Sequence, residues 1–211
     1  MKSRMFPFIT KTWNPVGGEC GIGCYYCWAR QLIKKYGMKK YQGEPRLFIS
    51  ELQKTFTKDD FVFVCDMRDL FEPNVPSAMI QQVLNYIAKS SATFLLLTKN
   101  PHRYLEFAIP QNCVCGATIE TDIDGRIGRF ISMRELKHPR KMIAIEPIME
   151  FTPEFQDWIF SICPEFIAVG YDNYGNHLSE PELEDVLALI HGCENRGVRV
   201  YRKTLREKKQ T

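Results

Sequence analysis

Three cysteines near the N-terminus are the residues whose type and spacing most directly indicate chemistry. Cys20, Cys24 and Cys27 lie within the stretch GGECGIGCYYCWAR (17–30), and a helix-like run follows. A closed structural zinc site takes four ligands, and a disulfide takes two. Three thiolates can hold three corners of a four-iron, four-sulfur cube, which is usually held by four. The fourth iron then keeps a free coordination position, as a catalytic metal does.

Two glycines between the thiols, Gly21 and Gly23, would let the backbone bend around bulky sulfides without a Cβ clash. The alternative is a zinc site with a distant fourth ligand, for which the C-V-C pair Cys113 and Cys115 is available. That pair stands at the start of a predicted strand, at the opposite end of the sheet from the loop. We therefore favour a [4Fe-4S] cluster over zinc and over a chance grouping.

The other five cysteines are scattered in apolar surroundings, and we expect them to be small core residues: Cys65, Cys113, Cys115, Cys163 and Cys193. The N-terminal MKSRMFPFIT has no long apolar stretch or small-residue cleavage site, and no run in the chain approaches membrane-spanning length. We expect a cytoplasmic protein without a membrane partner, in which clustered thiols indicate metal or catalysis.

Apolar runs of strand length recur along the chain and are mostly continuous, which is typical of parallel strands covered on both faces. They span residues 6–10, 61–65, 93–98, 114–120, 142–146, 166–170 and 198–202, with a weaker candidate in PRLFIS (45–50). Segments with helical spacing lie between them. In the segment before Gly197, Ser179 and Glu182 are spaced as a capping box, and the glycine is a stop signal.

This alternation predicts an α/β fold with a parallel sheet, either a full or partial barrel or an open doubly wound sheet. Our prediction is a partial (βα)6-type TIM-like barrel with one extra C-terminal strand. The cysteine loop falls between the first strand and the first helix, where such folds bind ligands. The helix after it should present one apolar face, formed by Trp28, Leu32, Ile33 and Tyr36.

We expect one domain over residues 1–202 and a basic tail at 203–211. A second basic block is RQLIKKYGMKK (30–40), which contains no acid. Either block could bind phosphates. We favour the ordinary interpretation, which is a solvated helix face and a frayed end.

The C-x3-C-x2-C spacing, with Tyr26 just before the last cysteine, resembles the signature of the radical S-adenosylmethionine (SAM) superfamily. The resemblance implies a (βα) barrel and a free iron that chelates SAM. It also implies reductive cleavage of SAM to a 5′-deoxyadenosyl radical that takes a hydrogen atom from a substrate. A flavodoxin- or ferredoxin-type electron donor would be the partner.

Further segments are similar to a phage-associated radical-SAM-like family of unsettled substrate, and more loosely to spore photoproduct lyase. They are TWNP (12–15), VFVCDMRDLFEPNVP (62–76), FLLLTKNPHR (94–103), CGATIETD (115–122), IAIEPI (143–148) and VGYDNYG (169–175). The similarity runs to about residue 175.

The resemblance implies that strand ends on the cluster side hold SAM. Asp66 would meet the methionine amino group, although CDMRD stands where many members have G-G-E. Thr98 and Lys99 would lie at the SAM carboxylate, Glu120 at the ribose hydroxyls, and Tyr26 near the adenine. The alternatives are a surface lysine at a helix start, a helix N-terminal acid for Glu120, and loop packing for Tyr26.

Four more residues are weaker candidates. Cys65 ends a predicted strand and could return a hydrogen atom to a substrate radical, although a buried strand cysteine is the commoner role. Glu146, Tyr171 and Asp172 follow later strands and are substrate-side candidates. The predicted function is a radical SAM enzyme of unknown substrate, with nucleic acid as one candidate. The alternative is a non-catalytic zinc or iron–sulfur module that binds nucleic acid.

Overall fold

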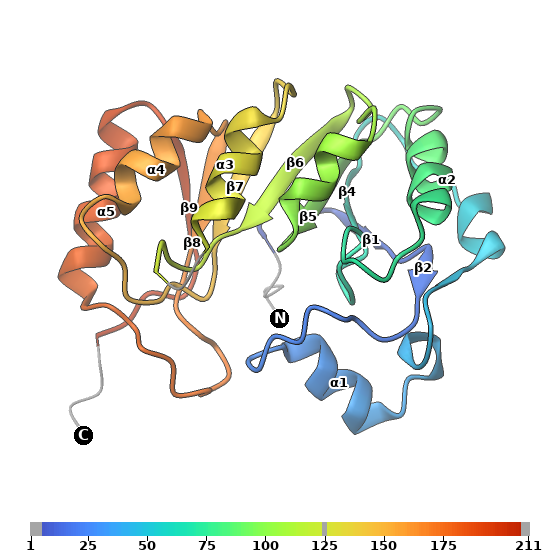
Figure 1. Cartoon of the computed structure of the whole chain (residues 1–211), viewed down its shortest axis with the longest axis horizontal. Coiled ribbons are helices and arrows are strands. Elements are labelled where there is room, and N and C mark those ends of the chain that lie inside the picture. Colours follow the sequence, from blue (N-terminus) through green and yellow to red (C-terminus); the bar gives the residue numbers. More distant parts are fainter. Residues whose placement is uncertain (1–5, 124–125, 208–211) are drawn as a thin grey trace. The chain divides into compact units, whose positions relative to one another are not determined.

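The computed structural model describes residues 6–123 and 126–207. The described chain forms two compact units (Figure 1). The first unit is Phe8–Cys115, and the second joins the residues up to Pro7 to those from Gly116 onwards. These units are compact parts of the described chain. The prediction of a single domain over residues 1–202 stays a prediction. Residues 208–211 of the expected basic tail lie outside the described range.

Seven strands form one sheet in the order β1-β4-β5-β6-β7-β8-β9. Their bounds are β1 Lys11–Trp13, β4 Phe61–Val64, β5 Thr93–Thr98, β6 Cys113–Thr118, β7 Lys141–Ile145, β8 Phe166–Val169 and β9 Arg199–Arg202. The strands run parallel, as the registers of β1 with β4, β4 with β5, β7 with β8 and β8 with β9 show. The order follows the chain, whereas a doubly wound sheet reverses it. The predicted α/β class is confirmed, with a topology consistent with a partial (βα) barrel.

The apolar runs predict β4 to β9 to within two residues, but the first strand is misplaced. The strand is β1, Lys11–Trp13, and not 6–10. Pro7 has no N–H to donate to a ladder, and Lys11 and Thr12 are exposed because β1 lies at one end of the strand order. An edge strand needs only one apolar face, so hydropathy alone does not detect it.

A small antiparallel pair, β2 (Val16–Gly17) with β3 (Arg46–Leu47), accompanies the sheet in the first unit. β3 lies within the weakly predicted PRLFIS segment. Three short 3-10 helices complete this unit: η1 (Lys39–Tyr41), η2 (Ile49–Gln53) and η3 (Pro101–Glu106). The connection from β5 to β6 therefore carries η3 in place of a full α-helix.

As the alternation predicts, α-helices lie between successive strands of the sheet, except between β5 and β6. They are α1 (Trp28–Tyr36) and α2 (Ser77–Ile87) in the first unit, and α3 (Ile127–Glu135), α4 (Phe155–Ile162) and α5 (Leu183–Asn195) in the second. α3, α4 and α5 pack in succession (Figure 1). α5 ends before Gly197, whose φ is +79°, but the capping box is wrong. Glu182 is the N-cap residue and its side chain makes no capping hydrogen bond.

All eight cysteines are free thiols. Four of the five scattered ones are buried as predicted, but Cys163 is exposed because it follows the last turn of α4 as its left-handed cap. Among the helices described, none has the length and hydropathy required to span a bilayer.

Candidate functional site

The cysteine loop runs from the end of β2 into the first turn of α1. Cys20, Cys24 and Cys27 are all partly exposed. Cys27 is the N-cap of α1, and its sulfur accepts a hydrogen bond of 3.4 Å from the backbone N–H of Arg30. The end of the loop is therefore fixed by the helix it starts. The helix in turn is fixed by its apolar face.

That face is one residue narrower than predicted. Trp28, Leu32 and Ile33 pack against a buried cluster that includes Tyr41 and Met67. Tyr36, expected on the same side, is 64% exposed. It occupies the last helical position, where the chain turns away at Gly37 in a left-handed conformation.

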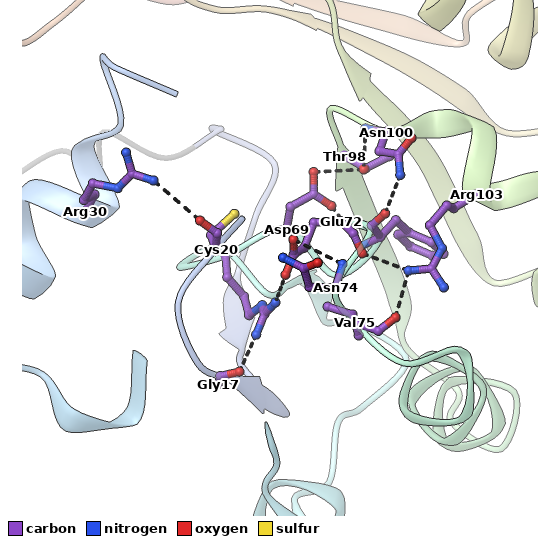
Figure 2. A network of polar contacts seen from close by, with 12 residues as sticks. Gly17, Cys20, Arg30, Asp69, Glu72, Asn74, Val75, Thr98, Asn100 and Arg103 are labelled. Carbon is purple, nitrogen blue, oxygen red and sulfur yellow. Dashed lines mark hydrogen bonds and ion pairs between the residues drawn. The ribbon is translucent and has the colours of Figure 1, made fainter. Parts of the chain in front are cut away.

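The two glycines of the loop have different structural reasons. Gly21 is required by close packing and Gly23 by its backbone conformation. A Cβ atom on Gly21 would overlap Glu72 Oε2 and lie 2.7 Å from Asn74 Nδ2. Gly23 has a φ of +75°, which L-residues rarely adopt. Beside Gly21, Arg30 Nη2 reaches the Cys20 carbonyl oxygen at 3.5 Å (Figure 2). The loop thus lies directly on the segment that follows β4.

Asp69 links this loop to the end of β5. Its Oδ2 accepts from the Thr98 hydroxyl at 2.9 Å (Figure 2) and from the Lys99 backbone N–H at 2.8 Å. Burial raises the pKa of the Asp69 carboxyl, while these hydrogen bonds act in the opposite direction. Burial also raises the pKa of the Cys20 thiol, against hydrogen bonds from the backbone of Asp69 and Ile22. Asp69 therefore contacts both the thiol loop and the predicted SAM-binding strand end.

A fully buried ion pair lies in the same segment. Arg68 Nη2 and Glu72 Oε1 are 2.5 Å apart, and both side chains are 0% exposed. Arg68 Nη1 also donates to the carbonyl oxygen of Gly17, at the end of β2. Arg103 supports the pair from η3, with Nη1 2.8 Å from the carbonyl oxygens of Glu72 and Val75 (Figure 2). The start of the cysteine loop is thereby tied to one buried network.

Asp66, the predicted partner of the methionine amino group, is held by the TWNP segment. Asn14 Nδ2 donates to Asp66 Oδ1 at 2.5 Å, and the Met67 backbone N–H donates to Asn14 Oδ1 at 3.3 Å. Burial raises the pKa of Asp66, and the Asn14 hydrogen bond lowers it by less. Next to it, Cys65 is buried with a φ of +56°, and burial raises the pKa of its thiol to about 12.

Two predicted SAM contacts touch one another. Lys99 Nζ donates to the Tyr26 hydroxyl at 2.8 Å and lies 5.1 Å from the centre of its ring. Thr98 is buried at the same strand end. The first unit therefore brings together Tyr26, Thr98 and Lys99. Their roles toward SAM stay predictions.

The remaining candidates belong to the second unit and are engaged within it. Glu120 is 1% exposed and pairs with Arg129 Nη1 at 2.6 Å. Glu146 Oε2 pairs with Lys203 Nζ at 2.7 Å, so the expected tail is ordered there. Their roles toward ribose and substrate stay predictions.

Tyr171 and Asp172 shape the loop after β8. The Tyr171 hydroxyl donates to the Pro181 carbonyl oxygen at 3.1 Å from a buried position. Asp172 accepts from the backbone N–H groups of Tyr174 and Asn176 at 3.1 and 2.6 Å. Both side chains thus hold the local chain, and their substrate-side role stays a prediction.

The donor set of the loop fits a four-iron cube. In the described part of the chain, no three His, Cys, Asp or Glu side chains are placed to hold one metal ion. A cube places its thiolates on different irons, so convergence on one ion is not what it requires. Three free thiols on one partly exposed loop, anchored at both ends, are the ligand type that such clusters use.

The sequence patterns did not identify the residues that support the loop, which are Asn14, Arg68, Asp69, Glu72, Asn74 and Arg103. Two signals were available. TWNP and DLF belong to the segments that resemble the phage-associated family, and Arg68 and Glu72 have the i, i+4 spacing of an ion pair, although their segment is not helical. Neither signal says that these segments meet the cysteine loop.

Replacing Gly21 by alanine should displace the loop, because the new methyl group overlaps Glu72 and Asn74. We expect lower iron binding and a loss of about 1–3 kcal/mol in unfolding free energy. Gly128→Ala is the control, because Gly128 lies in α3 with nothing within 4 Å and should be neutral or slightly stabilising. Iron content and urea unfolding measure both. Equal behaviour of the two variants would contradict the close packing.

Cys65 should resist alkylation in the folded protein. With a pKa of about 12, only about one thiol in ten thousand is ionised at pH 8, and the thiolate is the nucleophile. Iodoacetamide labelling followed by mass spectrometry should modify the exposed Cys163 first. Labelling of Cys65 at a rate equal to that of Cys163 would contradict the buried position.

The fold of this chain is similar to that of a protein of known structure. A solved structure of a spore photoproduct lyase mutant, with bound AdoMet and dinucleoside spore photoproduct, is similar to this chain. The TM-score is 0.57 at 10% sequence identity, over 97% of this chain and 80% of that one. The resemblance is to the fold of a radical SAM enzyme. No curated protein matches the chain.

A family profile matches almost the whole chain, from residue 4 to residue 207. The description of that family is "Protein of unknown function (DUF5131)". The chain therefore belongs to the DUF5131 family.

Proposed function

We propose that the protein is a radical SAM enzyme that binds a [4Fe-4S] cluster through Cys20, Cys24 and Cys27. The observation that carries the proposal is the loop itself. It presents three free thiols within eight residues, and Gly21 packs it onto the buried Arg68–Glu72 pair. The similarity to the fold of spore photoproduct lyase supports it, because that structure holds AdoMet.

The cluster, when bound, supplies the electron that cleaves SAM to the 5′-deoxyadenosyl radical. The protein's own residues bind and orient the ligands. Lys99 carries the positive charge suited to the SAM carboxylate, and the contact with Tyr26 holds its ammonium beside the loop. Asp66, oriented by Asn14, is an acceptor for the methionine amino group. Glu120 is the acceptor proposed for ribose hydroxyls.

Cys65 is proposed as a hydrogen donor to a substrate radical. Its raised pKa keeps the S–H bond intact at neutral pH, which hydrogen-atom donation requires. Glu146, Tyr171 and Asp172 are the substrate-side candidates of the second unit. A flavodoxin or ferredoxin is the class of reductant we expect. Nucleic acid is the candidate substrate class, since the similar lyase structure holds a dinucleoside.

Anaerobic reconstitution with iron and sulfide tests the proposal. We expect about four irons and four sulfides per chain. Adding SAM to the reduced protein should change its electron paramagnetic resonance spectrum, because SAM chelates the free iron. One zinc per chain, with no spectral response to SAM, would instead support the non-catalytic module.

A further inference from the structure

The first unit carries an exposed basic surface beside the cysteine loop. We call it the basic face, and it consists of Arg30, Lys34 and Lys35 of α1 with Lys39 of η1. All four side chains are exposed. Arg30 and Lys34 are one turn apart, so they lie on one side of the helix, opposite Leu32, which packs inward.

Among the described residues, no acidic side chain forms an ion pair with the basic face. Within residues 6–123 and 126–207, none of its four side chains forms an ion pair, and α1 has no acid in its first turn. Neighbouring cations are compensated: Lys40 and Lys54 both pair with Glu51, and Lys11 pairs with Asp60. Lys34 and Lys35 lie in the last turn of α1, where the helix dipole favours cations, and their exposed charge remains available to a polyanion.

Two tyrosines flank this face. Tyr25 and Tyr36 are each 64% exposed, the highest values among the exposed large hydrophobic side chains in the described part of the chain. Tyr36 lies beside Lys35, whose Nζ is 5.4 Å from its ring centre. Exposed aromatic rings among cations are how proteins hold single-stranded nucleic acid, by stacking bases while cations follow the backbone.

The basic face also adjoins the cysteine loop. Arg30 Nη2 contacts the Cys20 carbonyl oxygen, and Tyr25 lies between Cys24 and Cys27 (Figure 2 shows Arg30 beside Cys20). A strand bound along α1 would therefore pass next to the three thiols. We propose that the basic face, with Tyr25 and Tyr36, binds a nucleic acid segment whose bases are unstacked. That the bound nucleic acid is the substrate rests on the proposed function. That the basic face binds nucleic acid rests on its charge and exposure.

Fluorescence anisotropy with a labelled 15-nucleotide single strand of mixed sequence tests the binding. The variant is Lys34→Gln/Lys35→Gln/Lys39→Gln. The matched control, Lys58→Gln/Lys89→Gln/Lys137→Gln, removes the same charge at exposed lysines elsewhere. We expect weaker binding only in the first variant. The slope of log K against log salt should become shallower by about 2, because each of the three lost phosphate contacts contributes about 0.7.

Tyr36→Ser separates stacking from charge. We expect it to weaken binding about fivefold or more, while Tyr36→Phe, which keeps the ring, binds like the wild type. Equal weakening by both lysine triples, or equally tight binding of a poly-glutamate peptide of the same charge, would overturn the proposal. The second result would indicate an acidic protein partner.

Cofactor measurements on the same wild-type preparation keep the two proposals apart. A chain that binds DNA through the basic face but takes up no iron and sulfide refutes the proposed function alone. A chain that cleaves SAM but whose DNA affinity is unaffected by the lysine triple refutes this inference alone.

Discussion

Replacing any one of Cys20, Cys24 and Cys27 by alanine should abolish binding of the iron–sulfur cluster. Each thiol is free, and all three lie on one anchored loop. Loss of an outer-shell partner alone costs a metal site about 10- to 100-fold, so loss of a ligand should cost more. Iron, sulfide and the visible absorption of the reconstituted protein measure the effect.

Cys163→Ala is the matched control, because Cys163 is a free, exposed thiol at the end of α4. It should leave iron and sulfide content unchanged. The three loop variants should also retain the folded state, since the loop thiols are partly exposed. Circular dichroism checks this. A loop variant that still holds four irons would contradict the assignment of that cysteine.

Breaking the Arg68–Glu72 ion pair should give the largest loss of stability. Both side chains are fully buried, and Glu72→Gln would leave the Arg68 charge without its partner. Breaking a buried pair costs about 3–5 kcal/mol, so we expect that loss in unfolding free energy. Chemical denaturation measures it. The loop should also bind iron less well, because Gly21 packs on Glu72.

Two further variants make this result specific. Glu194→Gln breaks the exposed pair with Arg202 and should cost about 1 kcal/mol or less. Arg68→Met/Glu72→Leu removes both charges and should be less harmful than the single change, since Arg68 Nε has no hydrogen-bond partner in the described structure. A Glu72→Gln variant as stable as Glu194→Gln would contradict a supporting role for the pair.

The fold was largely predictable from local patterns. Continuous apolar runs predicted β4 to β8, because buried parallel strands are apolar on both faces, and the mixed run VRVYR predicted β9, whose residues are exposed or half-buried. β1 was misplaced because Lys11 and Thr12 are exposed at the edge of the sheet. Gly197 marked the end of α5 through its left-handed conformation, whereas Ser179 and Glu182 formed no capping box.

The candidate site was predictable only where its residues are close in sequence. The three thiols were found because they lie within eight residues. Asn14 and Asp66 meet across 52 positions, and Tyr26 and Lys99 across 73, so spacing carries no signal of these contacts. Asp69 lies in the segment VFVCDMRDLFEPNVP (62–76), but only the fold brings it to Thr98, so the sequence carries no signal of this contact.

Reductive cleavage of SAM tests the central claim most directly. The reconstituted protein is incubated anaerobically with dithionite and SAM, and 5′-deoxyadenosine is measured by liquid chromatography with mass spectrometry. Our account predicts 5′-deoxyadenosine from the wild type and from Cys163→Ala, and none above background from Cys24→Ala. No product from a wild type that holds one zinc, or undiminished product from Cys24→Ala, would contradict it.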